Sequence, residues 1–200
     1  MENQTLATRP AVEGIGERID DQQRKTVIAK AIALTRLDTY NASMGPNKLL
    51  KELAKTTSDP IAKAIALTRL DRYSASMGPT APLVELAETT SDPIAKAIAL
   101  TRLDTYNASM GPTAPLVELA ETTSDPIAKA IALTRLDTYN ASMGPTAPLV
   151  KLAETTSDPI AKAIALTRLD TYNASMGPNP QLRKIAIQNT FGNIPFLAAA

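Results

Sequence analysis

SDPIAKAIALTRLDTYNASMGPTAPLVELAETT, residues 91–123, is the stretch that decides the fold. Residues 124–156 repeat it with one change, Lys151 in place of Glu118, and residues 58–90 repeat it with two changes, at positions 72 and 74. A period of 33 residues indicates a stack of supersecondary units, because repeats of this length bury their apolar faces against one another.

Each unit carries the signals of two helices. Asp59 before Pro60 is typical of an N-cap followed by proline in the first turn, and no helix breaker follows until Gly78. We therefore expect a long helix over residues 60–77, which Gly-Pro ends. A short helix follows, capped by the Thr80 side chain and ending near residue 89.

The long helix is expected to be apolar on two opposed sides at about 100° per residue. Such a helix needs cover on both sides, which places it between the long helices of the preceding and following units. The expected fold class is an all-α solenoid of tandem 33-residue αα-hairpin repeats, with about ten helices and distinct N- and C-terminal caps. The first stripe consists of Ala62, Ala66, Leu70, Tyr73 and Met77, and the second of Ile61, Ala64, Ile65, Thr68 and Ala75.

The expected domain organisation is one elongated array with different ends. Residues 1–16 are expected to be loosely ordered, and residues 17–57 to form a capping first repeat whose long helix extends back to Ile19. Residues 157–200 are expected to form the last repeat and the C-terminal cap. The internal repeats are 58–90, 91–123 and 124–156. Because even exposed positions are copied among them, the array indicates recent duplication or design, and we favour design.

Composition excludes several classes of function. The formal net charge is +1, so no strong field would recruit nucleic acid or an anionic membrane. The chain has no cysteine, no apolar run long enough to span a membrane, and no secretory signal at its start. We expect no membrane association and a cytoplasmic location, or recombinant expression in the cytosol.

The residues of common catalytic sites are missing. The chain has no histidine, which removes Ser-His-Asp and Cys-His arrangements and the commonest zinc ligand. It also has no phosphate-binding glycine motif and no calcium-binding loop. We therefore expect no catalytic residue, no cofactor-binding residue and no metal ligand, and a protein that is not an enzyme.

The candidate functional residues form ladders, meaning the copies of one helix position in successive repeats. One interpretation is a groove that grips an extended chain through guanidinium and amide groups. The alternative, which we favour, is solvation and hydrogen bonding in which the Arg of one copy meets the Asp or the C-terminal carbonyl groups of the next. The tyrosines of the first stripe are expected to be core residues. The candidate binding-face ladders are Arg36, Arg69, Arg102, Arg135 and Arg168, and Asn41, Asn107, Asn140 and Asn173 with Ser74 between them.

A two-helix repeat of this length resembles the tetratricopeptide and pentatricopeptide repeats. The resemblance covers repeat length and helix pairing. The Trp-Leu-Gly-Tyr signature of the former is missing, and Thr-Tyr-Asn, common in the latter, lies here near the end of its helix. The resemblance therefore implies stacked helix pairs and assigns no functional residue.

Three functions follow from these observations. The first is a non-catalytic repeat scaffold that binds a protein or peptide, and the alternative is a structural spacer or a self-assembling building block. A nucleic-acid reader with one repeat per base is less favoured, since residues 91–123 contain two basic and four acidic residues.

Overall fold

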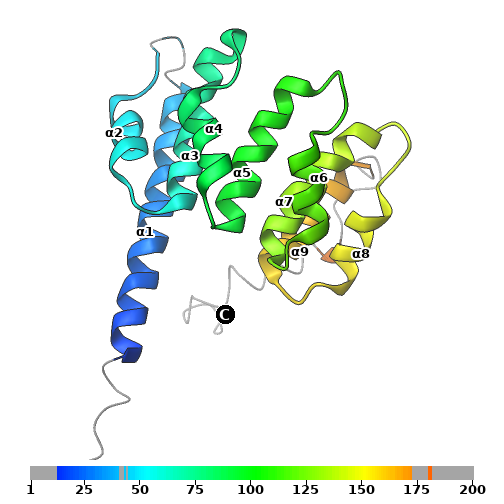
Figure 1. Cartoon of the computed structure of the whole chain (residues 1–200). Coiled ribbons are helices and arrows are strands. Elements are labelled where there is room, and N and C mark those ends of the chain that lie inside the picture. Colours follow the sequence, from blue (N-terminus) through cyan, green and yellow to red (C-terminus); the bar gives the residue numbers. More distant parts are fainter. Residues whose placement is uncertain (1–12, 41–42, 44, 173–179, 182–200) are drawn as a thin grey trace, which may run out of the picture. The chain divides into compact units, whose positions relative to one another are not determined.

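The computed structural model describes residues 13–40, 43, 45–172 and 180–181 (Figure 1). Every regular element within these ranges is helical, and the described part contains no strand. No helix in it is long and apolar enough to cross a membrane. The described helices pack against their neighbours in a recurring way, which is the packing of a helical repeat. The tenth expected helix and the C-terminal cap fall mainly on residues outside these ranges, as does most of the segment 1–16.

The contacts divide the chain into two compact units, and the first ends at Tyr73. It contains α1 (Glu13–Tyr40), α2 (Lys48–Thr56) and α3 (Pro60–Asp71). Helix α3 packs against both α1 and α2. Helix α1 begins at Glu13, six residues before the expected start, because nothing between Glu13 and the repeat sequence breaks a helix except two tolerated glycines.

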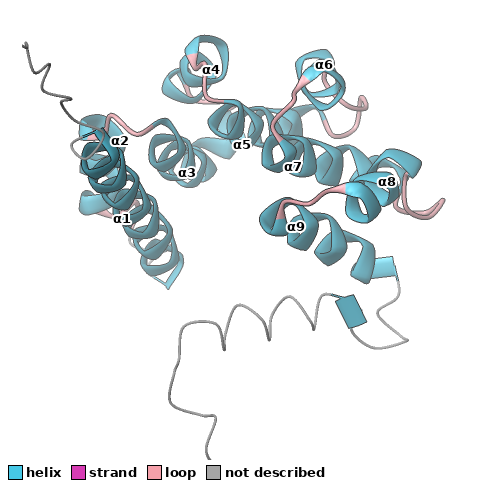
Figure 2. Ribbon diagram, turned by 90° about the horizontal axis from the view of Figure 1, so that it is seen from below, coloured by secondary structure: helices cyan, strands magenta, loops and turns pink. Residues whose placement is uncertain are grey.

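The second unit begins at Ser74, and its described residues form three long helices and three short ones. Helix α7 lies between α5 and α9, and the short helices form a second row outside them (Figure 2). Each short helix packs against the long helix that follows it. The prediction that an internal long helix is covered by its two neighbours is therefore confirmed for α7. The helices are α4 (Ala81–Thr89), α5 (Pro93–Asp104), α6 (Ala114–Thr122), α7 (Pro126–Asp137), α8 (Ala147–Thr155) and α9 (Pro159–Asp170).

The starts of the long helices follow the predicted capping. In α7 the Asp125 carboxylate accepts the N–H of Ala128 at 2.8 Å, with Pro126 in the first turn. The Thr123 hydroxyl accepts the N–H of Asp125 at 3.2 Å and so orders the turn before the cap. The same arrangement begins α3, α5 and α9. In the turn between α5 and α6, Gly111 adopts a φ of 92°, a conformation that favours glycine.

The long α-helices are shorter than predicted. Helix α5 ends at Asp104 and continues as a 3₁₀ segment over Thr105–Asn107, where a continuous α-helix was expected. The Thr105 N–H bonds the Arg102 carbonyl three residues back, and the Thr105 hydroxyl donates to the same carbonyl at 2.6 Å. These bonds tighten the last turn. The α7 end repeats this pattern.

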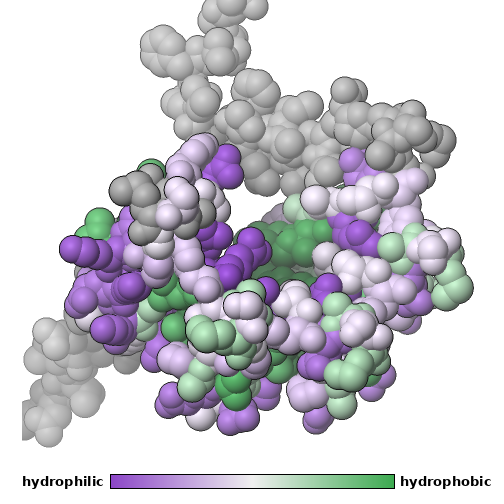
Figure 3. Space-filling model, turned by 90° about the horizontal axis from the view of Figure 1, so that it is seen from above, coloured by the Kyte–Doolittle hydropathy of each residue, from purple (hydrophilic) through white to green (hydrophobic). Residues whose placement is uncertain are grey.

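Burial confirms the small-residue contact and corrects the stripes. In α7, Ala128, Ala130 and Ala132 are completely buried. Leu133, which neither stripe includes, is also buried. The assignment of methionine to the first stripe is wrong. Met77 is 83% exposed and its copy Met110 is 79% exposed, since a 3₁₀ segment at or before the methionine redirects the chain. Over the face in Figure 3, hydrophobic residues lie interspersed with hydrophilic ones.

Candidate functional site

The polar centre of each repeat contact is a buried aspartate at the end of a long helix. Asp104 is completely buried. Its Oδ1 accepts the backbone N–H of Thr113 at 2.7 Å, which ties the end of α5 to the start of α6. Its Oδ2 accepts Arg135 Nε and the Tyr139 hydroxyl, both at 2.6 Å, which ties α5 to the next long helix. One carboxylate therefore joins three segments.

This Asp–Arg–Tyr network recurs in both units. In the first unit Asp38 Oδ2 accepts Arg69 Nε at 2.6 Å and the Tyr73 hydroxyl at 2.8 Å. In the second unit Asp137 Oδ2 accepts Arg168 Nε at 2.7 Å and the Tyr172 hydroxyl at 2.6 Å. In each, Oδ1 accepts the backbone N–H of the residue just before the short helix, at 2.7 Å. Within each unit the networks thus connect one repeat with the following one.

The arginine and tyrosine also contact each other. The Arg135 guanidinium lies 5.0 Å from the centre of the Tyr139 ring, and its Nη2 donates to the Tyr139 hydroxyl at 3.2 Å. Its Nη2 also reaches the Asp104 carbonyl at 3.4 Å, and Nη1 reaches the Thr138 hydroxyl at 3.3 Å. Only 17% of the Arg135 side chain is exposed. Every guanidinium nitrogen therefore has a partner inside the protein.

The charges in the networks are mutually stabilised. Burial alone would raise the pKa of Asp104, but hydrogen bonds from Tyr139, Thr113 and Arg135 outweigh burial and hold that pKa below its ordinary value. The same balance lowers the pKa of Asp38 and Asp137. Burial, followed by the hydrogen bond to the carboxylate, raises the pKa of Tyr139. The networks therefore contain an ionised carboxylate and a neutral phenol near neutral pH.

The arginine ladder mostly lies inside these networks. Arg69, Arg135 and Arg168 pair with an aspartate, as the favoured interpretation expected, but the partner belongs to the preceding repeat instead of the next. Arg102 bonds the Thr105 and Tyr106 side chains. These contacts give the ladder a structural role, and its role in ligand binding stays a prediction.

The asparagine ladder is less engaged. The side chains of Asn107 and Asn140 are half-buried, and within the described structure neither amide group makes a hydrogen bond. Their backbone carbonyl groups accept the N–H of Met110 and Met143 at 2.8 Å. Asn41 and Asn173 lie outside the described residues. The two described amides are therefore available to an external partner.

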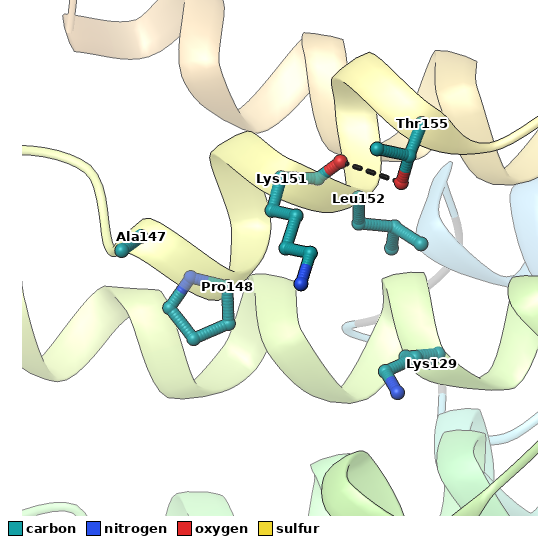
Figure 4. Close-up of a pocket in the computed structure, with 6 residues that line it drawn as sticks. All are labelled: Lys129, Ala147, Pro148, Lys151, Leu152 and Thr155. Carbon is teal, nitrogen blue, oxygen red and sulfur yellow. Dashed lines mark hydrogen bonds between the residues drawn. The ribbon is translucent and has the colours of Figure 1, made fainter.

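A groove between α7 and α8 has a volume of about 510 Å³, within the range of sites that take a small ligand or a side chain (Figure 4). Its apolar wall comes from Pro148 and Leu152 of α8. Lys151 extends from α8 toward α7, which contributes Lys129 (Figure 4). The groove is thus apolar with two ammonium groups at its sides, although its residues were not among the predicted sites.

Two further features were missed. The threonines of the second stripe, Thr35, Thr68, Thr101 and Thr134, bury a hydroxyl that has no hydrogen-bond partner. The Thr80 side chain and its copies do not cap the short helices as predicted. In the copy at Thr113 the Asp104 carboxylate instead accepts the backbone N–H of Thr113 itself. A signal existed: Asp recurs nine residues before each of these threonines.

No group of three potential metal ligands occurs among the described residues. Comparison of the chain with protein families, with curated proteins and with solved structures gave no match.

Proposed function

We propose that the chain is a non-catalytic helical repeat scaffold that binds a protein or peptide. In this proposal the array is an α-solenoid of tandem 33-residue αα-hairpins with distinct caps, built by design or by recent duplication. The α7–α8 groove is the observation that carries the proposal, because it combines an apolar wall with charged side chains at an exposed surface.

The charges of the groove favour an acidic ligand. Lys129 and Lys151 both line it, and neither forms an ion pair within the described structure. The copy of Lys151 in the preceding repeat is Glu118, and the copy of Lys129 there is Lys96. The fourth repeat therefore presents two positive charges where the third presents one of each sign. An extended segment with a carboxylate beside an apolar side chain would complement the fourth groove.

The repeats provide a matched pair of variants. Lys151→Glu makes residues 124–156 identical to residues 91–123, and Glu118→Lys makes the reverse change. Both side chains are exposed, so neither change should disturb folding. Peptides would be selected from a displayed library on the full chain, and their affinity for both variants measured by fluorescence polarisation.

The proposal expects selected peptides rich in Asp or Glu, weaker binding to Lys151→Glu and stronger binding to Glu118→Lys. Asn107→Ala and Asn140→Ala test in the same assay whether the asparagine ladder contributes. Selection of no peptide would contradict the binding function. Equal affinity for both charge variants would show that the groove is not the site.

A further inference from the structure

The two sides of a long helix make different halves of one contact. We call the side of a long helix that meets the preceding long helix its backward face, and the side that meets the following one its forward face. On α7 and the 3₁₀ segment after it, the backward face carries Arg135 and Tyr139, which bond the aspartate of α5. Its forward face carries Thr134 and Asp137, and Asp137 bonds the arginine and tyrosine of α9. The contact is therefore directional, with a forward face always meeting a backward face.

Helix α1 exposes a backward face. Its forward-face residues Ala31 and Leu34 are buried against the rest of the first unit. On its other side Ile32 is 56% exposed, Leu37 53% and Tyr40 72%. Among the described residues nothing takes the place that a preceding long helix would occupy. This exposed apolar area is large for a helix that repeats a buried sequence.

Among the described residues no helix covers the forward face of α9. Its backward-face residues Ala161 and Ala165 are completely buried. On the forward side Thr167 is exposed and Ala163 is half-buried, although Ala130, the copy of Ala163 in α7, is completely buried. This is the surface that another long helix covers in α7.

The sequences of the two end helices match the internal pair. Residues 28–40 and 160–172 both read IAKAIALTRLDTY, as do residues 94–106 and 127–139, which supply α5 and α7. A contact of α9 with an α1 would therefore bring together the same side chains as the contact of α5 with α7. Shape complementarity of the two exposed faces follows from this identity.

The charges at the ends are complementary as well. Arg36 lies 5.0 Å from the Tyr40 ring centre and donates to the Tyr40 hydroxyl at 3.2 Å, the arrangement found in every network. Within the described part of the chain no carboxylate pairs with Arg36. At the other end, Asp170 is the copy of the aspartates that receive an arginine and a tyrosine from the following helix.

We propose that copies of this chain stack head to tail, with the forward face of α9 of one copy on the backward face of α1 of the next. In this contact Asp170 of one copy accepts Arg36 Nε and the Tyr40 hydroxyl of the next. The two faces differ, so the contact is heterologous and adds copies successively without closing a pair.

Sedimentation velocity of the full chain over a wide range of concentration tests this assembly. The expected result is a weight-average mass that rises with concentration beyond that of a dimer. Arg36→Asp and Asp170→Arg should each weaken association by about tenfold or more, because each places like charges in the contact. A mixture of the two variants should associate again, since every junction between unlike variants joins opposite charges.

Glu121→Arg is the control for a charge reversal away from both faces, and it should associate like the unchanged chain. Thr167→Arg blocks the α9 face sterically and leaves Asp170 in place, which guards against a folding defect in Asp170→Arg. A chain that stays monomeric at every concentration would overturn the proposal. Unchanged association of Arg36→Asp and Thr167→Arg would overturn it too.

Discussion

Replacement of Asp104 by asparagine removes the charge at the centre of one repeat contact. The new amide oxygen can still accept the Thr113 N–H that Asp104 accepts at 2.7 Å. Its NH₂ group, however, would take the place of the oxygen that accepts Arg135 Nε at 2.6 Å. Both groups are hydrogen-bond donors, so no bond can form between them. Asp104→Asn therefore leaves a largely buried guanidinium without its counter-ion, which costs about 3 kcal/mol of unfolding free energy.

Tyr139→Phe and a double-mutant cycle resolve this further. The phenylalanine loses the hydroxyl that donates to Asp104 at 2.6 Å, a charge-assisted hydrogen bond worth about 1.5 kcal/mol. Since both variants break the same bond, the double variant should lose less than the sum, by about 1 kcal/mol. The assay is urea unfolding followed by circular dichroism at neutral pH.

The matched control is Glu121→Gln, which removes a carboxylate charge from an exposed position and should change stability by less than about 0.5 kcal/mol. If Asp104→Asn costs no more than Glu121→Gln, the carboxylate is not buried in a network. Strict additivity in the cycle would show that Asp104 and Tyr139 do not interact.

Three further predictions concern pH and packing. The lowered pKa of Asp38, Asp104 and Asp137 contributes stability that is fully present above the ordinary pKa of about 3.9 and is lost as pH falls through the lowered pKa. The raised pKa of Tyr139 contributes stability that is fully present below the ordinary pKa of about 10 and is lost as pH rises through the raised pKa. Melting temperature should therefore form a plateau between these limits, and a maximum below the acid limit would contradict this. Thr134→Val removes a buried hydroxyl that has no hydrogen bond, and it should stabilise the fold by about 1 kcal/mol in urea unfolding. Destabilisation would indicate that the hydroxyl does form a bond, like that of Thr167 to the Ala163 carbonyl at 2.7 Å. Ala130→Leu should overpack the contact of α7 with its neighbours and lower the free energy of unfolding by about 1–3 kcal/mol. Ala114→Leu, at an exposed position, is the control. Equal melting temperatures of the two variants would show that Ala130 is not closely packed.

Local signals were the predictable part of this fold. Asp125 before Pro126 predicts the start of α7, because a cap depends only on adjacent residues. The short helices could be placed from their flanking turns for the same reason. The alternation of Ala128 and Ala130 on opposite sides predicted a helix covered twice, which is the case for α7.

The polar contacts were harder to predict, because residue type was weighed above position. Arg69 was left out of the first stripe, although it stands seven residues after Ala62 and therefore on the same side of the helix. Asp71 lies on the opposite side, among the second stripe. A helical wheel gives these directions, but it does not reveal that the neighbouring helix brings a complementary charge. The 3₁₀ turn after Asp104 was also missed.

The central claim is that each repeat is stabilised by contacts with its neighbours. Insertion of one, two or three further copies of residues 91–123 after residue 123 tests it most directly, with the urea midpoint measured for each chain. If neighbouring repeats stabilise one another through the Asp–Arg–Tyr networks and the alanine contacts, the midpoint rises with each added copy. A midpoint that stays the same at every length would contradict the account.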